Sequence, residues 1–281
     1  MPVVENNNIT DAMSLAAVGQ LTSTASMAHN LSQCRVLIQK AVKAGAKALF
    51  LPEAADYIAS SGPESVKLVR SVDESDFVRG LRDEARRHQL PIQVGVHEPG
   101  ESANKVKNTL LWIDQNGEIL QRYQKVHLFD VDIKGGPVLK ESDWVERGEQ
   151  ILPPADTPLG KVASAICFDM RFPEISLALR RMGSDIITYP SAFTVPTGKA
   201  HWEVLLRARA IESQCYVIAS AQVGRHNEKR VSYGHSMIID PWGRVLADVG
   251  EAAQEPEIAT AVIDHDLLRK VRTEMPLSRR T

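Results

Sequence analysis

Three residues that together could hydrolyse an amide, Glu53, Lys125 and Cys167, each lie at or just beyond the end of an apolar, strand-like segment. Cys167 follows the run 162–166 and precedes Pro173, which is typical of the first position of a helix. A thiol at such a turn would lie near the positive end of a helix dipole, which favours the nucleophilic thiolate. The alternative interpretation is a buried structural cysteine.

The three residue types match the steps of amide hydrolysis through a cysteine. Cys167 could attack the carbonyl carbon and form a thioester, which water then hydrolyses. Glu53 could take the thiol proton and return a proton to the leaving amine, if burial raises its pKa. Lys125, with the backbone N–H of Phe168, could stabilise the oxyanion of the tetrahedral intermediate. This chemistry needs no metal and no organic cofactor.

The elements that must position these residues are read from apolar periodicity and turn signals. Asn30 is the expected cap of the first helix, and the stretch 131–158 is expected to be a long irregular loop. The alternation favours a layered α/β fold but does not choose between one doubly wound sheet and two packed sheets. We expect strands at 15–21, 46–51, 90–96, 109–114, 118–123, 161–167, 185–189, 216–221, 235–240, 244–249 and 260–263, and helices at 30–44, 73–88, 174–182, 199–214 and 264–273.

The bulk properties of the 281-residue chain exclude several classes of protein. A formal net charge of -2 gives no electrostatic reason to expect nucleic acid as a partner. Three widely spaced cysteines form neither a disulfide framework nor a zinc pattern, so we expect a reducing compartment. No apolar run is long enough for a bilayer, and neither a secretory signal nor a clear transit peptide is visible. We expect a cytosolic protein with a mobile tail at 1–12 and a single domain at 13–281.

Three motifs give the chain a resemblance to the nitrilase superfamily, the carbon-nitrogen hydrolases with a Glu-Lys-Cys triad. They are Leu-Pro-Glu ending at Glu53, Tyr-Gln-Lys-Val-His-Leu-Phe around Lys125, and Ile-Cys-Phe-Asp-Met-Arg-Phe-Pro-Glu around Cys167, in the superfamily's order. The resemblance implies a four-layer αββα sandwich with two sheets face to face. It also implies homodimers or larger assemblies built through the helical faces, and no cofactor.

The superfamily has a second glutamate in the loop after the lysine. Glu141 and Glu146 are the candidates here, and Glu141 matches the pattern better. It could hold Lys125 in place or orient the attacking water; the alternative is a solvated loop acid. His127 would share a face with Lys125 on an extended segment, and a structural role is expected for it.

The predicted substrate contacts follow the nucleophile. Arg171 could bind a substrate carboxylate in a forked pair, or form a structural salt bridge with Asp169 or Glu174. The loop that contains Phe193 and Thr197 could hold an anionic end of the substrate, or Thr197 could simply cap the next helix.

Within the superfamily the chain is most similar to the Nit branch, and there to the amidases that act on deaminated glutathione. The segments that carry this likeness are 127–132, 190–193, 201–203, 207–216, 233–237 and 240–243. It implies release of 2-oxoglutarate from a small-molecule amide, as a metabolite repair reaction. The alternatives are an omega-amidase acting on 2-oxoglutaramate and a Fhit-linked scaffold whose hydrolase site is vestigial.

Overall fold

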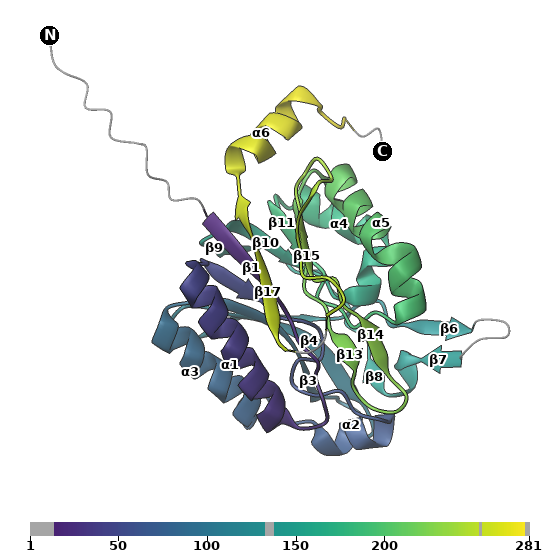
Figure 1. The fold of residues 1–281 in the computed structure, drawn as a ribbon. Coiled ribbons are helices and arrows are strands. Elements are labelled where there is room, and N and C mark those ends of the chain that lie inside the picture. Colours follow the sequence, from purple (N-terminus) through teal and green to yellow (C-terminus); the bar gives the residue numbers. More distant parts are fainter. Residues whose placement is uncertain (1–13, 133–137, 253–254, 279–281) are drawn as a thin grey trace, which may run out of the picture.

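The computed structural model describes residues 14–132, 138–252 and 255–278, so the predicted tail at 1–12 lies outside the described residues. Two β-sheets form the centre of the molecule, and helices lie on their outer sides (Figure 1). The first sheet has the order β17-β1-β2-β3-β4-β5, with β8 paired to β4. Its strands are β1 (Ser14–Gln20), β2 (Ala48–Phe50), β3 (Ile92–Pro99), β4 (Val106–Ile113), β5 (Ile119–Gln124), β8 (Val145–Glu146) and β17 (Glu257–Ile263).

The second sheet has the order β16-β15-β12-β11-β10-β9. In both sheets the middle strands are parallel: β2 pairs with β1 and β3, and β11 pairs with β10 and β12. Antiparallel strands lie on either side of these. The strands of the second sheet are β9 (Ala155–Thr157), β10 (Gly160–Ser164), β11 (Ile186–Thr188), β12 (Tyr216–Ala219), β15 (Met237–Ile239) and β16 (Val245–Asp248).

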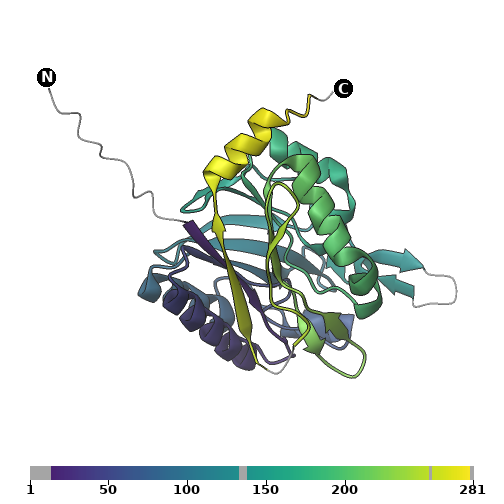
Figure 2. The same ribbon diagram turned by 45° about the horizontal axis from the view of Figure 1, so that its top comes forward.

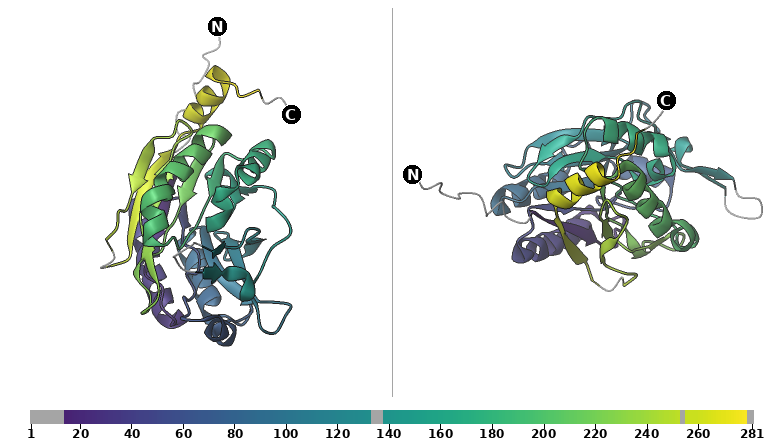
Figure 3. Two further views of the ribbon diagram at one scale, coloured as in Figure 1. Left: turned by 90° about the vertical axis from the view of Figure 1, so that its right-hand side faces the viewer. Right: turned by 90° about the horizontal axis from the view of Figure 1, so that it is seen from above.

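The helices cover the outer faces of the two sheets. Helices α1 (Met27–Ala44) and α3 (Asp76–His88) pack on the first sheet, and α4 (Pro173–Arg181) and α5 (Val195–Ser213) on the second. Helix α6 (His265–Glu274) lies at the end of the molecule, which faces the viewer when the molecule is seen from above (Figure 3). A short helix, α2 (Gly62–Leu68), was not predicted from the sequence.

Three separate hydrophobic cores result from this layering. One lies between the first sheet and its helices, one between the second sheet and its helices, and one between the sheets. Phe50 and Trp112 of the first sheet share the middle core with Ile186, Tyr216 and Ile218 of the second. Because the central strands are buried on both faces, they are apolar without alternation. The four-layer αββα sandwich expected from the resemblance is confirmed.

Two local predictions were wrong. Ser26, not Asn30, caps α1, because its hydroxyl accepts the His29 N–H. Asn30 lies within the first turn of the helix, and its buried side chain donates to the backbone carbonyls of Thr24 and Asp56. The stretch 131–158 is not irregular throughout. It contains β8 and β9 of the main sheets, the 3-10 helix η1 (Glu141–Asp143) and the strand β7 (Val138–Lys140).

Two small hairpins stand outside the main sheets. Strand β7 pairs with β6 (Asp130–Asp132), and together they project from the body of the molecule (Figure 2). Strands β13 (Val223–Arg225) and β14 (Val231–Tyr233) form the other hairpin, which an isolated bridge joins to Thr194 at the start of α5. Among the helices of the described residues, none is long and apolar enough to cross a membrane.

Candidate active site

Glu53 lies in a tight turn directly after β2. The turn passes through Ala54, whose φ of 55° is in the left-handed region. Gly95 of β3 packs against it, exchanging hydrogen bonds with Pro52 and Ala55 (3.1 and 2.8 Å). A Cβ atom on Gly95 would lie 2.6 Å from the Cα of Glu53, so only glycine permits this approach.

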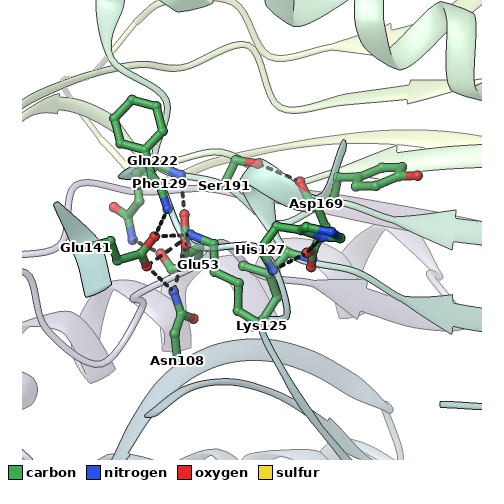
Figure 4. A network of polar contacts seen from close by, with 12 residues as sticks. Glu53, Asn108, Lys125, His127, Phe129, Glu141, Asp169, Ser191 and Gln222 are labelled. Carbon is green, nitrogen blue, oxygen red and sulfur yellow. Dashed lines mark hydrogen bonds and ion pairs between the residues drawn. The ribbon is translucent and has the colours of Figure 1, made fainter. Parts of the chain in front are cut away.

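The Glu53 carboxylate is buried and receives three hydrogen bonds (Figure 4). Oε1 accepts from the Lys125 ammonium (2.9 Å) and from the Asn108 amide (2.8 Å), and Oε2 accepts from the backbone N–H of Ala192 (2.9 Å). Ala192 follows β11 of the second sheet, whereas Glu53 follows β2 of the first. The carboxylate therefore connects the two sheets.

Lys125 follows β5 and is only 2% exposed. Its backbone N–H donates to the Asn108 carbonyl (2.9 Å), which fixes the start of its side chain. Its Nζ contacts Glu53 and both carboxylate oxygens of Glu141 (3.1 and 3.0 Å). Burial lowers the pKa of Lys125, but the two carboxylates outweigh that effect and hold it well above its ordinary value.

The structure separates the two candidates for the second glutamate. Glu141 lies beside Lys125, and its Oε2 also accepts the backbone N–H of Phe129 (2.6 Å). Glu146 instead accepts the backbone N–H groups of Glu101 and Ser102 at the surface. Glu141 is therefore the glutamate that the fold brings to the lysine.

Cys167 opens the 3-10 helix η2 (Cys167–Arg171), which follows the end of β10. Its φ is 44°, a strained value for a residue with a side chain. Its backbone N–H donates to the carbonyl of Pro190 (3.0 Å), and the side chain is buried in the core beneath α4 and α5.

Asp169 holds this turn. The carboxylate is fully buried and accepts the backbone N–H of Ile166 (2.9 Å) and the hydroxyl of Tyr123 (2.7 Å). It also accepts the backbone N–H of His127 and contacts the Nδ1 of that residue, both at 2.9 Å (Figure 4). The His127 ring stacks on Phe172 with centroids 3.7 Å apart. The structural role predicted for His127 is thus what the geometry shows.

The backbone N–H of Ala192, which donates to Glu53, also lies beside the Cys167 thiol, and the charges of Glu53, Lys125 and Glu141 shift the pKa of that thiol. Burial and the Glu53 carboxylate raise the pKa of Cys167 to about 12, against the opposing effects of Lys125 and the Ala192 N–H. The predicted thiolate was therefore wrong for the resting state, because desolvation and a neighbouring negative charge exceed any helix-dipole effect. Acid, ammonium and sulfur form one buried cluster.

The predicted pKa of Glu53 was also wrong in direction. Burial raises it, but the charge of Lys125 and the hydrogen bonds from Lys125 and Asn108 lower it more, so the pKa lies below its ordinary value. Glu53 is consequently a carboxylate, ready to accept a proton, and Cys167 is a thiol that still carries one.

The two groups predicted as oxyanion donors come from different segments, and their role stays a prediction. Lys125 contributes its ammonium from the first sheet. The backbone N–H of Phe168 has no hydrogen-bond partner among the described residues, whereas those of Cys167 and Asp169 are both engaged. A free N–H next to the nucleophile suits a developing negative charge on oxygen.

Arg171 lies in η2 and is half-buried near Cys167. Neither predicted salt bridge forms: within the described part of the chain no carboxylate lies within 4.0 Å of the Arg171 guanidinium. Its guanidinium carbon is 5.6 Å from the ring centroids of both Phe168 and Phe193. Thr197 does not cap α5, since Thr194 is the N-cap; its hydroxyl bonds to that of Thr194 (2.8 Å).

Two site residues were missed by sequence reasoning. Asn108 donates to both carboxylates, at 2.8 Å to Glu53 and 3.4 Å to Glu141. Gln222, in the loop between β12 and β13, donates to the backbone carbonyls of Glu53 and Ala54. A polar residue in the apolar strand 106–113 was a usable signal, but that strand was predicted to begin at 109. No cluster of three or more His, Cys, Asp or Glu side chains that could hold a metal is found among the described residues.

The carbon-nitrogen hydrolase family model matches residues 15–273. The chain belongs to the carbon-nitrogen hydrolase family. This is the nitrilase superfamily expected from the three motifs, and its members' chemistry is hydrolysis of carbon–nitrogen bonds, as in amides. The family match includes the segments that carry Glu53, Lys125 and Cys167.

Individual relatives agree with this family. A probable hydrolase, nit2, from Schizosaccharomyces pombe is 55% identical over 269 residues, covering 95% of this chain and 98% of the relative. The deaminated glutathione amidase of Rattus norvegicus is 44% identical, covering 98% and 84%. The crystal structure of the C. elegans NitFhit protein matches with a TM-score of 0.88 and 41% identity; the match covers 94% of this carbon-nitrogen hydrolase but only 63% of that longer chain.

Proposed function

We propose that this carbon-nitrogen hydrolase cleaves the amide bond of deaminated glutathione, releasing 2-oxoglutarate and cysteinylglycine. The observation that carries the proposal is the buried cluster in which the Glu53 carboxylate and the Lys125 ammonium act on the Cys167 thiol. The rat relative named deaminated glutathione amidase supports the choice of substrate.

Acylation follows from the protonation states in the cluster. Glu53 takes the proton of the Cys167 thiol as the sulfur attacks the amide carbon, and the carbonyl oxygen becomes an oxyanion between Lys125 and the Phe168 N–H. Glu53 then returns the proton to the amine nitrogen as the C–N bond breaks. The products of this half-reaction are a thioester on Cys167 and free cysteinylglycine.

Deacylation repeats the same steps with water. Glu53 accepts a proton from the attacking water, a second oxyanion forms at the same donors, and the C–S bond breaks. The proton returns to sulfur, so the cycle restores the thiol and consumes one water. Glu141, which contacts the ammonium at 3.0 Å, keeps Lys125 oriented and balances its charge throughout.

Arg171 is the proposed anchor for the carboxylate of the 2-oxo acid. Its guanidinium is half-buried, near Cys167, and without a carboxylate partner in the described residues. Phe193 forms a wall beside it. Loss of this anchor in Arg171→Leu should raise the KM for 2-oxo acid amides by about 30-fold or more, as expected for a desolvated ion pair of at least 2 kcal/mol. The role of Thr197 in substrate binding stays a prediction.

The test is turnover by purified wild-type enzyme and the Cys167→Ala variant. We expect wild type to hydrolyse deaminated glutathione and the variant to lose at least about 10⁴-fold in kcat with its fold retained. Cys34→Ala is the matched control, since Cys34 is a buried cysteine of α1 in the core on the outer side of the first sheet. Full turnover by Cys167→Ala would end the proposed mechanism.

The omega-amidase alternative differs only in the amine that leaves. A panel of deaminated glutathione, 2-oxoglutaramate, simple nitriles and N-carbamoyl amino acids, compared by kcat/KM, decides between the activities. The scaffold alternative predicts that Cys167→Ala changes no biological output. The homodimer and the cytosolic location remain predictions, the first of which sedimentation of the purified chain would test.

A further inference from the structure

The guanidinium of Arg171 is held from three directions. Its Nη2 lies 3.2 Å from Nδ1 of His201, and its carbon lies 5.6 Å from the ring centroids of Phe168 and Phe193. A long side chain that remains half-buried without a carboxylate partner normally has several accessible rotamers, whose loss opposes ligand binding. Here the three contacts restrict those rotamers before any ligand arrives.

The contact with His201 also fixes a tautomer. A guanidinium has only donors, so Nδ1 of His201 must accept and the ring proton lies on Nε2. In this hydrogen bond the lone pair of Nδ1 faces Arg171. A forked guanidinium has five N–H donors, so one can stay on His201 while others meet a carboxylate.

Helix α5 supplies this support twice. His201 contacts Arg171 directly. Its neighbour Trp202 packs on Phe193, with ring centroids 4.9 Å apart, and is itself fixed by a hydrogen bond from Nε1 to the His235 carbonyl (2.8 Å). His201 therefore contacts Arg171 by a hydrogen bond, and the next residue, Trp202, packs on the Phe193 ring that Arg171 faces.

We propose that His201 is a positioning residue that sets the preference of the active site for amides bearing a carboxylate. It orients Arg171 and has no part in bond breaking. The inference rests on the proposed function, since it assigns His201 to the anchor of the 2-oxo acid. Its prediction is a change in substrate affinity without a change in the chemical step.

The experiment compares His201→Ala, His201→Asn, Arg171→Leu and the double variant Arg171→Leu/His201→Ala, with deaminated glutathione as substrate. Loss of His201 should raise KM about fivefold while kcat stays within twofold of wild type. Asn carries an acceptor oxygen close to the position of Nδ1, so His201→Asn should recover most of the affinity. If His201 acts only through Arg171, adding His201→Ala to Arg171→Leu should change KM no further.

A second readout does not depend on turnover. Calorimetric binding of 2-oxoglutarate, the proposed product, should weaken about fivefold in His201→Ala and recover in His201→Asn. His29→Ala is the matched control, because His29 is an exposed histidine near the start of α1, on the outside of the other sheet. It should leave both measurements unchanged.

Different results overturn different claims. An unchanged KM in His201→Ala, an equal loss in His201→Asn, or additive losses in the double variant would remove His201 from the anchor. A wild type that neither turns over deaminated glutathione nor binds 2-oxoglutarate would instead overturn the proposed function. A fall in kcat at constant KM would contradict a positioning role.

Discussion

The turns that carry Glu53 and Cys167 lie on different sheets, and in each an aspartate follows the reactive residue and binds a histidine. Asp56 accepts the backbone N–H of His97 and contacts its Nδ1, at 2.8 and 2.9 Å. Asp169 makes the same two contacts with His127. The backbone is left-handed in both turns, at Ala54 and at Cys167.

The aromatic support is also alike. The His97 ring stacks on Tyr57 with centroids 4.3 Å apart, and the His127 ring stacks on Phe172 at 3.7 Å. Each aspartate thus fixes both the backbone and the ring of its histidine, while the ring packs against an aromatic residue of the turn itself. This arrangement keeps a strained turn in place regardless of whether it carries an acid or a thiol.

The two aspartate–histidine pairs differ in the segments that they connect. Asp56 and His97 both come from the first sheet. Asp56 follows β2, and His97 lies in β3. Asp169 follows β10 of the second sheet, but His127 and Tyr123 come from the β5 segment of the first. The Asp56–His97 pair therefore fixes one loop of the first sheet. The Asp169–His127 pair joins the two sheets and sets the position of Cys167 relative to Lys125.

Replacing each aspartate by asparagine tests whether the two turns depend equally on their aspartates. Asp169→Asn places an amide against four donor contacts of a fully buried carboxylate and should lower the free energy of unfolding by roughly 3–5 kcal/mol. Asp56→Asn should lower the free energy of unfolding by about 2 kcal/mol. The kcat should fall far more in Asp169→Asn than in Asp56→Asn. Urea unfolding and steady-state kinetics measure both. Equal losses of stability and of kcat in the two variants would mean that the contact of Asp169 across the two sheets matters no more than the contact of Asp56 within one.

Gly95→Ala tests the Glu53 turn separately, because the Gly95 backbone packs against that turn. The new Cβ would meet backbone atoms, 2.6 Å from the Cα of Glu53 and 2.8 Å from the carbonyl oxygen of Pro52. We expect a loss of about 1–3 kcal/mol in unfolding free energy and a lower kcat. Gly19→Ala is the control, since its Cβ would meet the flexible ends of Leu37 and Leu51 at 3.1 Å, and the backbone oxygen of Phe50 only at an ordinary contact distance of 3.5 Å. Similar kcat values in the two variants would contradict the predicted strain.

The smallest effect concerns the pH dependence of kcat/KM. The pKa of Glu53 lies below its ordinary 4.5, so the base is present at neutral pH and is lost only as pH falls through that lowered value. The pKa of Cys167 is about 12, so no alkaline limb from the thiol is expected below about pH 10. A flat profile from about pH 5 to 10 should result. A limb between pH 6 and 8 would contradict these protonation states.

The site was predictable where it depends on local sequence. Glu53 and Cys167 each follow an apolar run, Lys125 follows a strand of mixed polarity, and a strand followed by a turn can be recognised from neighbouring residues alone. Their ionisation could not be predicted, because the pKa values of Glu53 and Cys167 depend on charges that come from other segments.

The fold shows the same limit. Apolar periodicity located most strands and helices, but the pairing of strands into two sheets came only from the resemblance, since long-range pairing leaves no local signal. Asn30 was assigned as a cap because its residue type suits a cap, whereas the buried carbonyls of Thr24 and Asp56 explain it in the structure. Asn108 was missed for a similar reason, because its partners Glu53 and Glu141 are distant in sequence.

The high pKa of Cys167 affects how the resting enzyme meets oxidants. Peroxides react with the thiolate, and the raised pKa of Cys167 leaves very little of the sulfur ionised at neutral pH. A cysteine that is ionised at rest, as many redox-sensing cysteines are, would be converted to sulfenic acid far sooner. Because Glu53 is proposed to remove the proton only during attack on a bound amide, we expect peroxide to oxidise the nucleophile slowly between turnovers.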